Sequence, residues 1–90
     1  MSDQNLDSWM EFRARVSKER ERQLAKWGPQ THTSPEWIAI LGEEFGEAAK
    51  ACCDQWIQEQ PVDQLLKELI EVAAVAEAAY CDLSDMESGK

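Results

Sequence analysis

The chain has 90 residues and a formal net charge of −9, from nine Lys and Arg against eighteen Asp and Glu. A chain of this length forms one domain, so we expect a single domain over residues 1–90. The acidic balance excludes nucleic acid as the main partner, because phosphate backbones are bound through Lys and Arg. No apolar run approaches the roughly 18 residues of a membrane span, and residues 1–7 lack the pattern of a secretory signal. We therefore expect no nucleic acid and no membrane among its partners.

The first predicted helix covers residues 6–27, which are good helix formers without an internal Gly or Pro. Gly28 and Pro29 end it, because Gly suits the left-handed position after a helix and Pro cannot continue one. Residues 12–27 hold six basic and two acidic side chains, whereas residues 28–90 hold three basic and thirteen acidic ones. This asymmetry indicates either charge pairing between helices of one fold or a site that holds an anion and its balancing cation.

The second predicted helix begins with Ser34 as N-cap and Pro35 as the first helical residue, and it runs to about Gln58. Apolar residues repeat along it at steps of three and four, so this stripe is expected to face the core. The stripe consists of Trp37, Leu41, Phe45, Ala48, Cys52 and Trp56. Gly42 and Gly46 lie inside the helix, and two interior glycines suggest close approach of another backbone or a ligand.

Pro61 marks the joint before a third predicted helix, which runs to about Leu83 and leaves residues 84–90 as a frayed tail. Between residues 69 and 80 almost every face of this helix is apolar. A helix that is apolar all round is buried all round, and three helices of one chain cannot easily surround it. We therefore expect an all-α fold, a helical bundle of three main helices per chain that homo-oligomerisation completes along the third helix.

The three cysteines are odd in number, and two of them are adjacent in sequence. Adjacent residues on a helix point in different directions and cannot easily form a disulfide with each other. A zinc site is not favoured, because the chain has no C-x-x-C motif and His32 is its only histidine. We expect reduced thiols in a cytoplasmic protein.

Two pairs of glutamates with i, i+3 spacing occur on the second and third predicted helices. Glu44 and Glu47 form one pair, Glu68 and Glu71 form the other, and each pair lies on a line that continues into apolar residues. Carboxylates that converge between helices must protonate or bind a cation. The absence of Glu-x-x-His disfavours a di-iron site, and oxygen ligands favour Mg²⁺ or Mn²⁺. The alternative is that both pairs belong to a solvated acidic face.

The glutamate pattern resembles a known family signature. Residues 43–47 are E-E-F-G-E and residues 68–71 are E-L-I-E, with twenty residues between the two motifs. This arrangement resembles the E-E-x-x-E … E-x-x-D signature of the MazG-like, all-α nucleoside triphosphate pyrophosphohydrolases. Two further stretches, Arg22–His32 and Glu68–Ala76, resemble the short single-domain members of that family. The resemblance covers roughly residues 19–80 and departs from the family at Glu71, where Asp is usual.

The resemblance implies a MazG-like four-helix-type core, assembled as a homodimer or homotetramer. It also implies hydrolysis of a nucleoside triphosphate to the monophosphate and pyrophosphate. By position, the Mg²⁺ ligands, with Mn²⁺ as a possible substitute, are Glu44, Glu47, Glu68 and Glu71. Glu43 and Glu44 are the expected catalytic residues, with Glu43 as a further ligand or as the group that orients the attacking water.

The resemblance does not settle the base of the substrate. Similarity to the short members favours purine deoxynucleotides such as dGTP, and hydrolysis of dUTP or dCTP is the alternative within the same reaction. Outside enzymes, the alternative is a non-catalytic acidic helical module that binds a basic partner.

The expected substrate-binding residues are Arg20, Gln23, Lys26, Trp27, His32 and Tyr80. Arg20, Gln23 and Trp27 share one face of the first helix, because they are spaced i, i+3 and i+7. In a nucleotide pocket, the indole of Trp27 would stack on the base and the amide of Gln23 would bind its edge. Lys26 or Arg20 would bind phosphate. The loop histidine is a second candidate for phosphate or base, and the tyrosine is expected to reach a nucleotide from a neighbouring subunit. The alternative is that the indole closes the core and the cations pair with the acidic helices.

Overall fold

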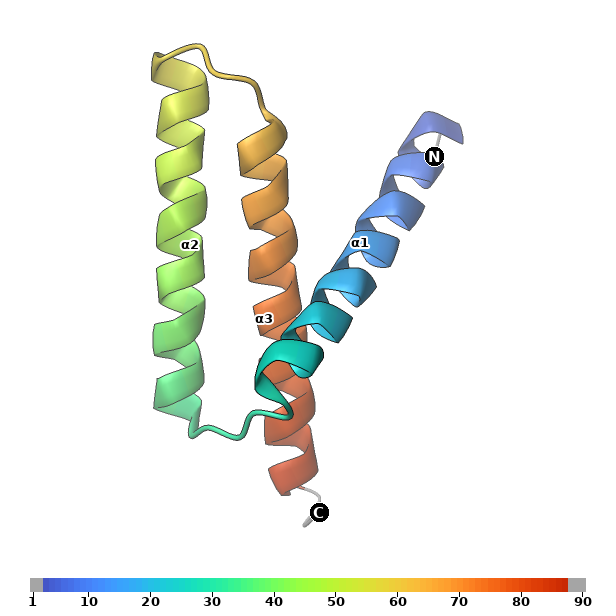
Figure 1. Cartoon of the computed structure of the whole chain (residues 1–90), viewed down its shortest axis with the longest axis vertical. Helices are drawn as coiled ribbons and strands as arrows, with labels where there is room; N and C mark the ends of the chain where they lie inside the picture. Colours follow the sequence, from blue (N-terminus) through green and yellow to red (C-terminus); the bar gives the residue numbers. More distant parts are fainter. Residues whose placement is uncertain (1–2, 88–90) are drawn as a thin grey trace.

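The computed structural model describes residues 3–87, which form three helices. These are α1 (Asp3–Trp27), α2 (Ser34–Ile57) and α3 (Asp63–Glu87). No strand occurs within the described range, so the all-α prediction is confirmed. Helices α2 and α3 run side by side as an antiparallel hairpin, while α1 crosses α3 and diverges from it toward its own N-terminus (Figure 1). Helix α3 is therefore the central element, packed against both of the others.

Helix α1 ends where the sequence predicts. Gly28 has a φ of +71°, and its N–H donates a hydrogen bond of 2.9 Å to the carbonyl oxygen of Leu24. A residue with a side chain is strained in this left-handed conformation, which explains the glycine. The turn directs the chain into the loop before α2.

Helix α2 is capped by Thr33, so the prediction of Ser34 as N-cap is wrong. The Thr33 hydroxyl accepts a hydrogen bond from the Glu36 N–H, and the Glu36 carboxylate accepts one of 2.8 Å from the Thr33 N–H. This reciprocal capping box requires Glu three residues after the cap, a spacing that Thr33 has and Ser34 lacks. Pro35 lies in the first turn, as predicted.

Helix α3 continues to Glu87, beyond its predicted end near Leu83. Residues 84–87 are thus helical, and the prediction of a frayed tail is wrong for them, while residues 88–90 lie outside the described part. Ser84 costs a helix only a few tenths of a kcal/mol relative to Ala, and the next glycine is Gly89, so nothing stops the helix at Leu83.

The core is small and lies between α3 and its two neighbours. Its buried apolar residues are Val16, Trp37, Ala48, Ala51, Ile70, Ala74 and Val75. No large side chain among the described residues is completely buried. The small side chains on α2 and α3 bring these two helices close together, and α1 adds its contact mainly through Val16.

The predicted core stripe of α2 is partly wrong. Trp37 and Ala48 are buried, but Phe45 is 62% exposed, Trp56 is 78% exposed and Cys52 is exposed. The face of α2 that packs against α3 instead includes Ala51 and lies on the side of the helix that carries Glu44 and Glu47. Alanines on that side permit closer helix approach than aromatic rings do, so the bulkier stripe is left on the surface.

Three further expectations concern single features of the chain. A Cβ added at Gly42 or Gly46 would meet no atom within 4 Å, so within residues 3–87 these glycines accommodate no close neighbour. All three thiols are free and exposed, in agreement with the sequence. Among the described helices, none combines the length and apolarity that crossing a membrane requires.

Candidate metal and nucleotide site

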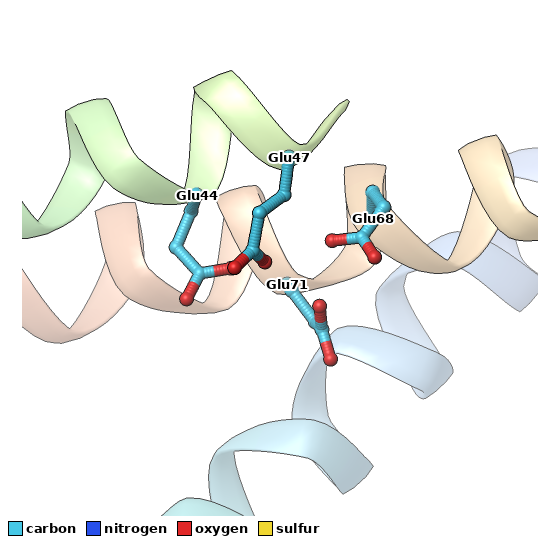
Figure 2. A group of neighbouring side chains, drawn as sticks. All are labelled: Glu44, Glu47, Glu68 and Glu71. Atoms are coloured by element: carbon cyan, nitrogen blue, oxygen red, sulfur yellow. The ribbon is translucent and has the colours of Figure 1, made fainter. Parts of the chain in front are cut away.

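Four carboxylates from two helices meet at the centre of the α2–α3 hairpin. Glu44 and Glu47 point from α2 toward α3, where Glu68 and Glu71 lie (Figure 2). Each residue offers a carboxylate oxygen, and these four oxygens all lie within 4.8 Å of one another. The i, i+3 spacing places each pair on one face of its helix, and the antiparallel hairpin brings the two faces together. We name these four residues the carboxylate cluster.

The carboxylate cluster is partly removed from solvent and poorly paired. Glu68 is only 8% exposed, Glu44 and Glu71 are half-buried, and Glu47 is exposed. The Oε2 atoms of Glu44 and Glu68 are buried without a hydrogen-bond partner, although Glu68 Oε1 accepts a bond of 2.6 Å from Gln64 Nε2. Among the side chains that the structure describes, no Lys or Arg nitrogen lies within 4.0 Å of the cluster. Buried carboxylate oxygens without a partner are costly, and either a proton or a bound cation would offset that cost.

The environment also shifts the acidities within the cluster. Burial raises the pKa of Glu44, and the negative charges of Glu47 and Glu68 raise it further. Burial raises the pKa of Glu71 to about 7, helped by a hydrogen bond with Glu68 and by the charges of Glu68 and Glu44. Protons therefore occupy part of the cluster near neutral pH, and a bound cation would replace them.

The donor set suits a hard divalent cation. It consists of carboxylate oxygens, without the nitrogen or sulfur ligands that zinc sites use. Mg²⁺ uses one or two carboxylates and completes its octahedron with water and phosphate oxygens. Four carboxylates at this spacing can thus hold one or two such ions and leave positions open for a phosphate ligand.

A cleft of about 400 Å³ opens between the three helices and the loop after α1. Glu44 and Glu71 lie on its wall, and so do Arg20, Gln23 and Trp27 of α1. A volume of this size lies within the range of small-molecule sites. The fold thus brings three of the expected substrate-binding residues to the same cleft as the carboxylate cluster.

The other three expected substrate-binding residues do not line this cleft. The Lys26 ammonium lies 4.7 Å from the centroid of the Trp27 ring, and the His32 ring packs edge-on against Trp37. Tyr80 is 75% exposed on the surface of α3. Its contact with a nucleotide bound to a neighbouring subunit stays a prediction.

Two of the cleft residues already have partners within the chain. Arg20 Nε lies 3.5 Å from Glu77 Oε1, and Gln23 Nε2 donates a bond of 3.1 Å to Glu19 Oε2. Glu43, an expected catalytic residue, is exposed on α2 and lies outside the carboxylate cluster. Its charge contributes to the raised pKa of Glu44.

Three further acidic residues line the cleft and were not predicted as site residues, namely Glu19, Asp82 and Asp85. Glu19 accepts bonds of 2.9 and 2.7 Å from Arg22, and this hydrogen bonding lowers the pKa of Glu19. The sequence contains the signal for these contacts, because Glu19 precedes Arg22 by three residues and Gln23 by four, which places all three on one face of the helix.

Asp82 fastens the loop before α2 to α3. Its Oδ2 atom accepts a hydrogen bond of 2.9 Å from the backbone N–H of His32 and one of 2.8 Å from the indole N–H of Trp37. These bonds lower the pKa of Asp82. Asp82 follows Glu71 by three helical turns on the same face of α3, a spacing that is visible in the sequence.

No family model, no curated protein and no solved structure matches the chain.

Proposed function

We propose that the protein is a Mg²⁺-dependent nucleoside triphosphate pyrophosphohydrolase, which hydrolyses its substrate to a nucleoside monophosphate and pyrophosphate. One observation carries the proposal. Four carboxylates from two helices converge within 4.8 Å of one another, and two of them lie on the wall of a 400 Å³ cleft with an indole, an amide and a guanidinium. A negatively charged triphosphate can approach these carboxylates only when cations neutralise their charge. The nucleoside would occupy the rest of the cleft.

In the proposal, one group of residues binds the metal ion and another group binds the nucleoside. Glu44, Glu47, Glu68 and Glu71 serve as the ligand set. When bound there, Mg²⁺ supplies neutralisation of the triphosphate and lowers the pKa of the attacking water. Because Glu68 is buried and its Oε1 is held by Gln64, its remaining oxygen is fixed in position before any ligand arrives.

In the proposed reaction, the oxygen of a water molecule attacks the α-phosphorus of the triphosphate. The bond from that phosphorus to the oxygen bridging toward the β-phosphorus breaks, and pyrophosphate leaves with the electron pair. Glu44 Oε2, which is buried and without a partner, accepts the proton of the water. Glu43 is exposed and lies outside the carboxylate cluster, so in the proposal it acts on Glu44 only through its charge.

The nucleoside lies in the proposal along α1. The Trp27 ring stacks on the base, Gln23 binds its edge, and Arg20 meets phosphate. Gln23 is hydrogen-bonded to Glu19, and a nucleotide would have to displace this contact, whereas Arg20 Nε lies in a 3.5 Å ion pair with Glu77 and makes no hydrogen bond. A purine deoxynucleotide such as dGTP is the substrate we propose first, with dUTP and dCTP as alternatives.

We propose further that the working unit is a homodimer or homotetramer in the cytoplasm. Exposed apolar side chains on α2 and α3, including Phe45, Trp56 and Leu69, support the assembly. Three free and exposed thiols support a reducing compartment.

The test is pyrophosphate release from a panel of ribo- and deoxynucleoside triphosphates, measured with Mg²⁺, with Mn²⁺ and with EDTA. We expect release of pyrophosphate and monophosphate in equal amounts with either metal and none with EDTA. Absence of metal-dependent release from every nucleotide would contradict the proposal and favour a non-catalytic acidic module.

A further inference from the structure

A second groove adjoins the carboxylate cluster. It has a volume of about 400 Å³ and lies between α1 and the first half of α3. Its basic side chains are Arg15, Lys18, Arg22 and Lys67. In a chain with nine Lys and Arg and a net charge of −9, four cations at one groove are a strong local reversal of charge. We name it the basic groove.

The cations of the basic groove are mostly unpaired. Arg22 binds Glu19 through two hydrogen bonds, of 2.7 and 2.9 Å. Among the described side chains, no carboxylate lies within 4.0 Å of Arg15, Lys18 or Lys67. If these three cations served only to balance the acidic helices, they would form ion pairs with them. Their arrangement leaves the groove with positive charge available to an anion.

The acidic residues in the groove reduce that charge only in part. They are Glu19, which Arg22 already neutralises, and Glu71, so four cations face two carboxylates in the groove. Lys67 acts on both carboxylates through its charge. The net field of the basic groove therefore favours a multivalent anion.

The basic groove and the cleft beside α1 share three residues. Glu19, Arg22 and Glu71 line both hollows, so the two meet beside the carboxylate cluster. A ligand that passes through this junction has its uncharged end near Trp27 and its anionic end near Lys18 and Lys67. A nucleoside triphosphate has this distribution of charge along its length.

We infer that the basic groove binds the terminal diphosphate of the substrate and, after hydrolysis, the released pyrophosphate. Ammonium and guanidinium groups are the side chains that bind phosphate oxygens by charge-assisted hydrogen bonds. The groove thereby selects a triphosphate over a monophosphate. The link to turnover rests on the proposed function, whereas the binding of inorganic pyrophosphate can be measured independently of it.

The experiment measures binding of inorganic pyrophosphate and of a nucleoside monophosphate to the full chain by calorimetry in the presence of Mg²⁺. In the double variant Lys18→Gln/Lys67→Gln, pyrophosphate binding should weaken about tenfold, because charge-assisted contacts are lost. Monophosphate binding should change less than about twofold, since the nucleoside contacts remain. If hydrolysis is present, the KM for triphosphate should rise while kcat changes little.

The matched control is Lys50→Gln, since Lys50 is a highly exposed lysine of α2, 3.9 Å from Asp54 and outside both hollows. It removes a positive charge without touching the groove, so pyrophosphate binding should stay at the wild-type level. Far-UV circular dichroism verifies the fold of each variant, and Arg15→Gln is the substitute if the double variant does not fold.

Each outcome decides the inference. Wild-type pyrophosphate affinity in the groove variants would overturn it, and so would an equal loss in the control, which would show an effect of net charge alone. Weaker pyrophosphate binding without hydrolysis of any nucleotide would support the groove and reject the proposed enzyme. Hydrolysis with unchanged pyrophosphate affinity in the variants would retain the enzyme and reject the groove.

Discussion

Two adjacent glutamates of α2 have different environments. Glu44 is half-buried and points into the carboxylate cluster, whereas Glu43 is exposed and lies outside it. Neighbouring residues on a helix point about 100° apart, so a shift of one position along α2 separates a residue of the site from a residue of the surface. The roles of individual glutamates therefore depend on helix phase, which substitution can test.

We expect Glu44→Gln and Glu68→Gln each to lower pyrophosphate release by about 100-fold or more, because each removes a charged oxygen ligand. Glu68→Gln should also raise the metal-free free energy of unfolding by on the order of 1 kcal/mol, since it removes a buried charge without full pairing. Release assays with Mg²⁺ measure the first effect, and urea denaturation with EDTA measures the second.

Glu21→Gln is the matched control, because Glu21 is an exposed glutamate of α1 outside the cluster and both hollows. It should leave activity and stability near the wild-type values, and all variants should keep their helicity by circular dichroism. Retained activity in Glu44→Gln or Glu68→Gln would remove that residue from the proposed metal site.

The raised pKa of Glu71 predicts an unusual pH dependence of stability. The pKa of Glu71 is about 7 in the folded chain against an ordinary value of 4.5, so the folded chain binds an extra proton between these values. The metal-free free energy of unfolding should therefore fall as the pH rises from about 4.5 to about 7, and Glu44 should act in the same direction. The pKa values of Glu19 and Asp82 are lowered in the folded chain, so these two residues make the free energy of unfolding rise with pH at the acidic end of the range.

Thermal unfolding between about pH 5 and pH 8 measures this effect, with and without Mg²⁺. The Tm without metal should decline across the range, and the rise in Tm on adding Mg²⁺ should be largest at the alkaline end, where no proton competes. A metal-free Tm that stays constant or rises across this range would contradict the assignment.

At the scale of the helix, the start of α2 depends on one side chain rather than its neighbour. Thr33 forms the capping box with Glu36, and Ser34 is the first residue inside the helix. Thr33→Ala should therefore lower the free energy of unfolding by about 1 kcal/mol, the usual loss of an N-cap, and Ser34→Ala by only a few tenths. Urea denaturation of both variants measures the difference. Equal losses, or a larger loss for Ser34→Ala, would reassign the cap.

The helices themselves follow from local signals, but their buried faces do not. Helix starts and stops lie near Gly28, Pro35 and Pro61, as expected from the backbone limits of these residues. Helix α2 carries two lines that could face inward, one with Phe45 and Trp56 and one with Glu44 and Ala51. The second packs against α3, because close approach of two helices favours small side chains over hydrophobicity alone.

The whole molecule is extended for its mass. Its radius of gyration is 15.0 Å, whereas a compact domain of this length has about 12 Å. Its accessible surface is 6840 Å², about 1500 Å² more than a folded monomer of 10.2 kDa usually has. Large apolar side chains such as Ile38, Phe45, Trp56 and Leu69 contribute to that excess. A surface of this size and character is sufficient for an interface between copies of the chain.

Size-exclusion chromatography with light scattering should therefore find a dimer or tetramer at micromolar concentration. Ala76 is exposed on α3, so Ala76→Glu should dissociate the assembly if the copies meet along that helix. Dissociation by Phe45→Glu instead would place the interface on α2. A wild-type monomer of about 10 kDa would contradict the prediction of assembly.

The helices and the pairing of the glutamates follow from the sequence alone, because both depend on residues a few positions apart. The 3.6-residue period placed Glu44 with Glu47 and Glu68 with Glu71, and Gly28 and Pro61 set the joints. Three features follow only from the packing of the helices. These are the buried face of α2, the hydrogen bond that joins Asp82 to the loop before α2, and the groove that Lys18 and Lys67 share. These features join residues far apart in the chain, and their geometry depends on how the three helices cross rather than on local preference.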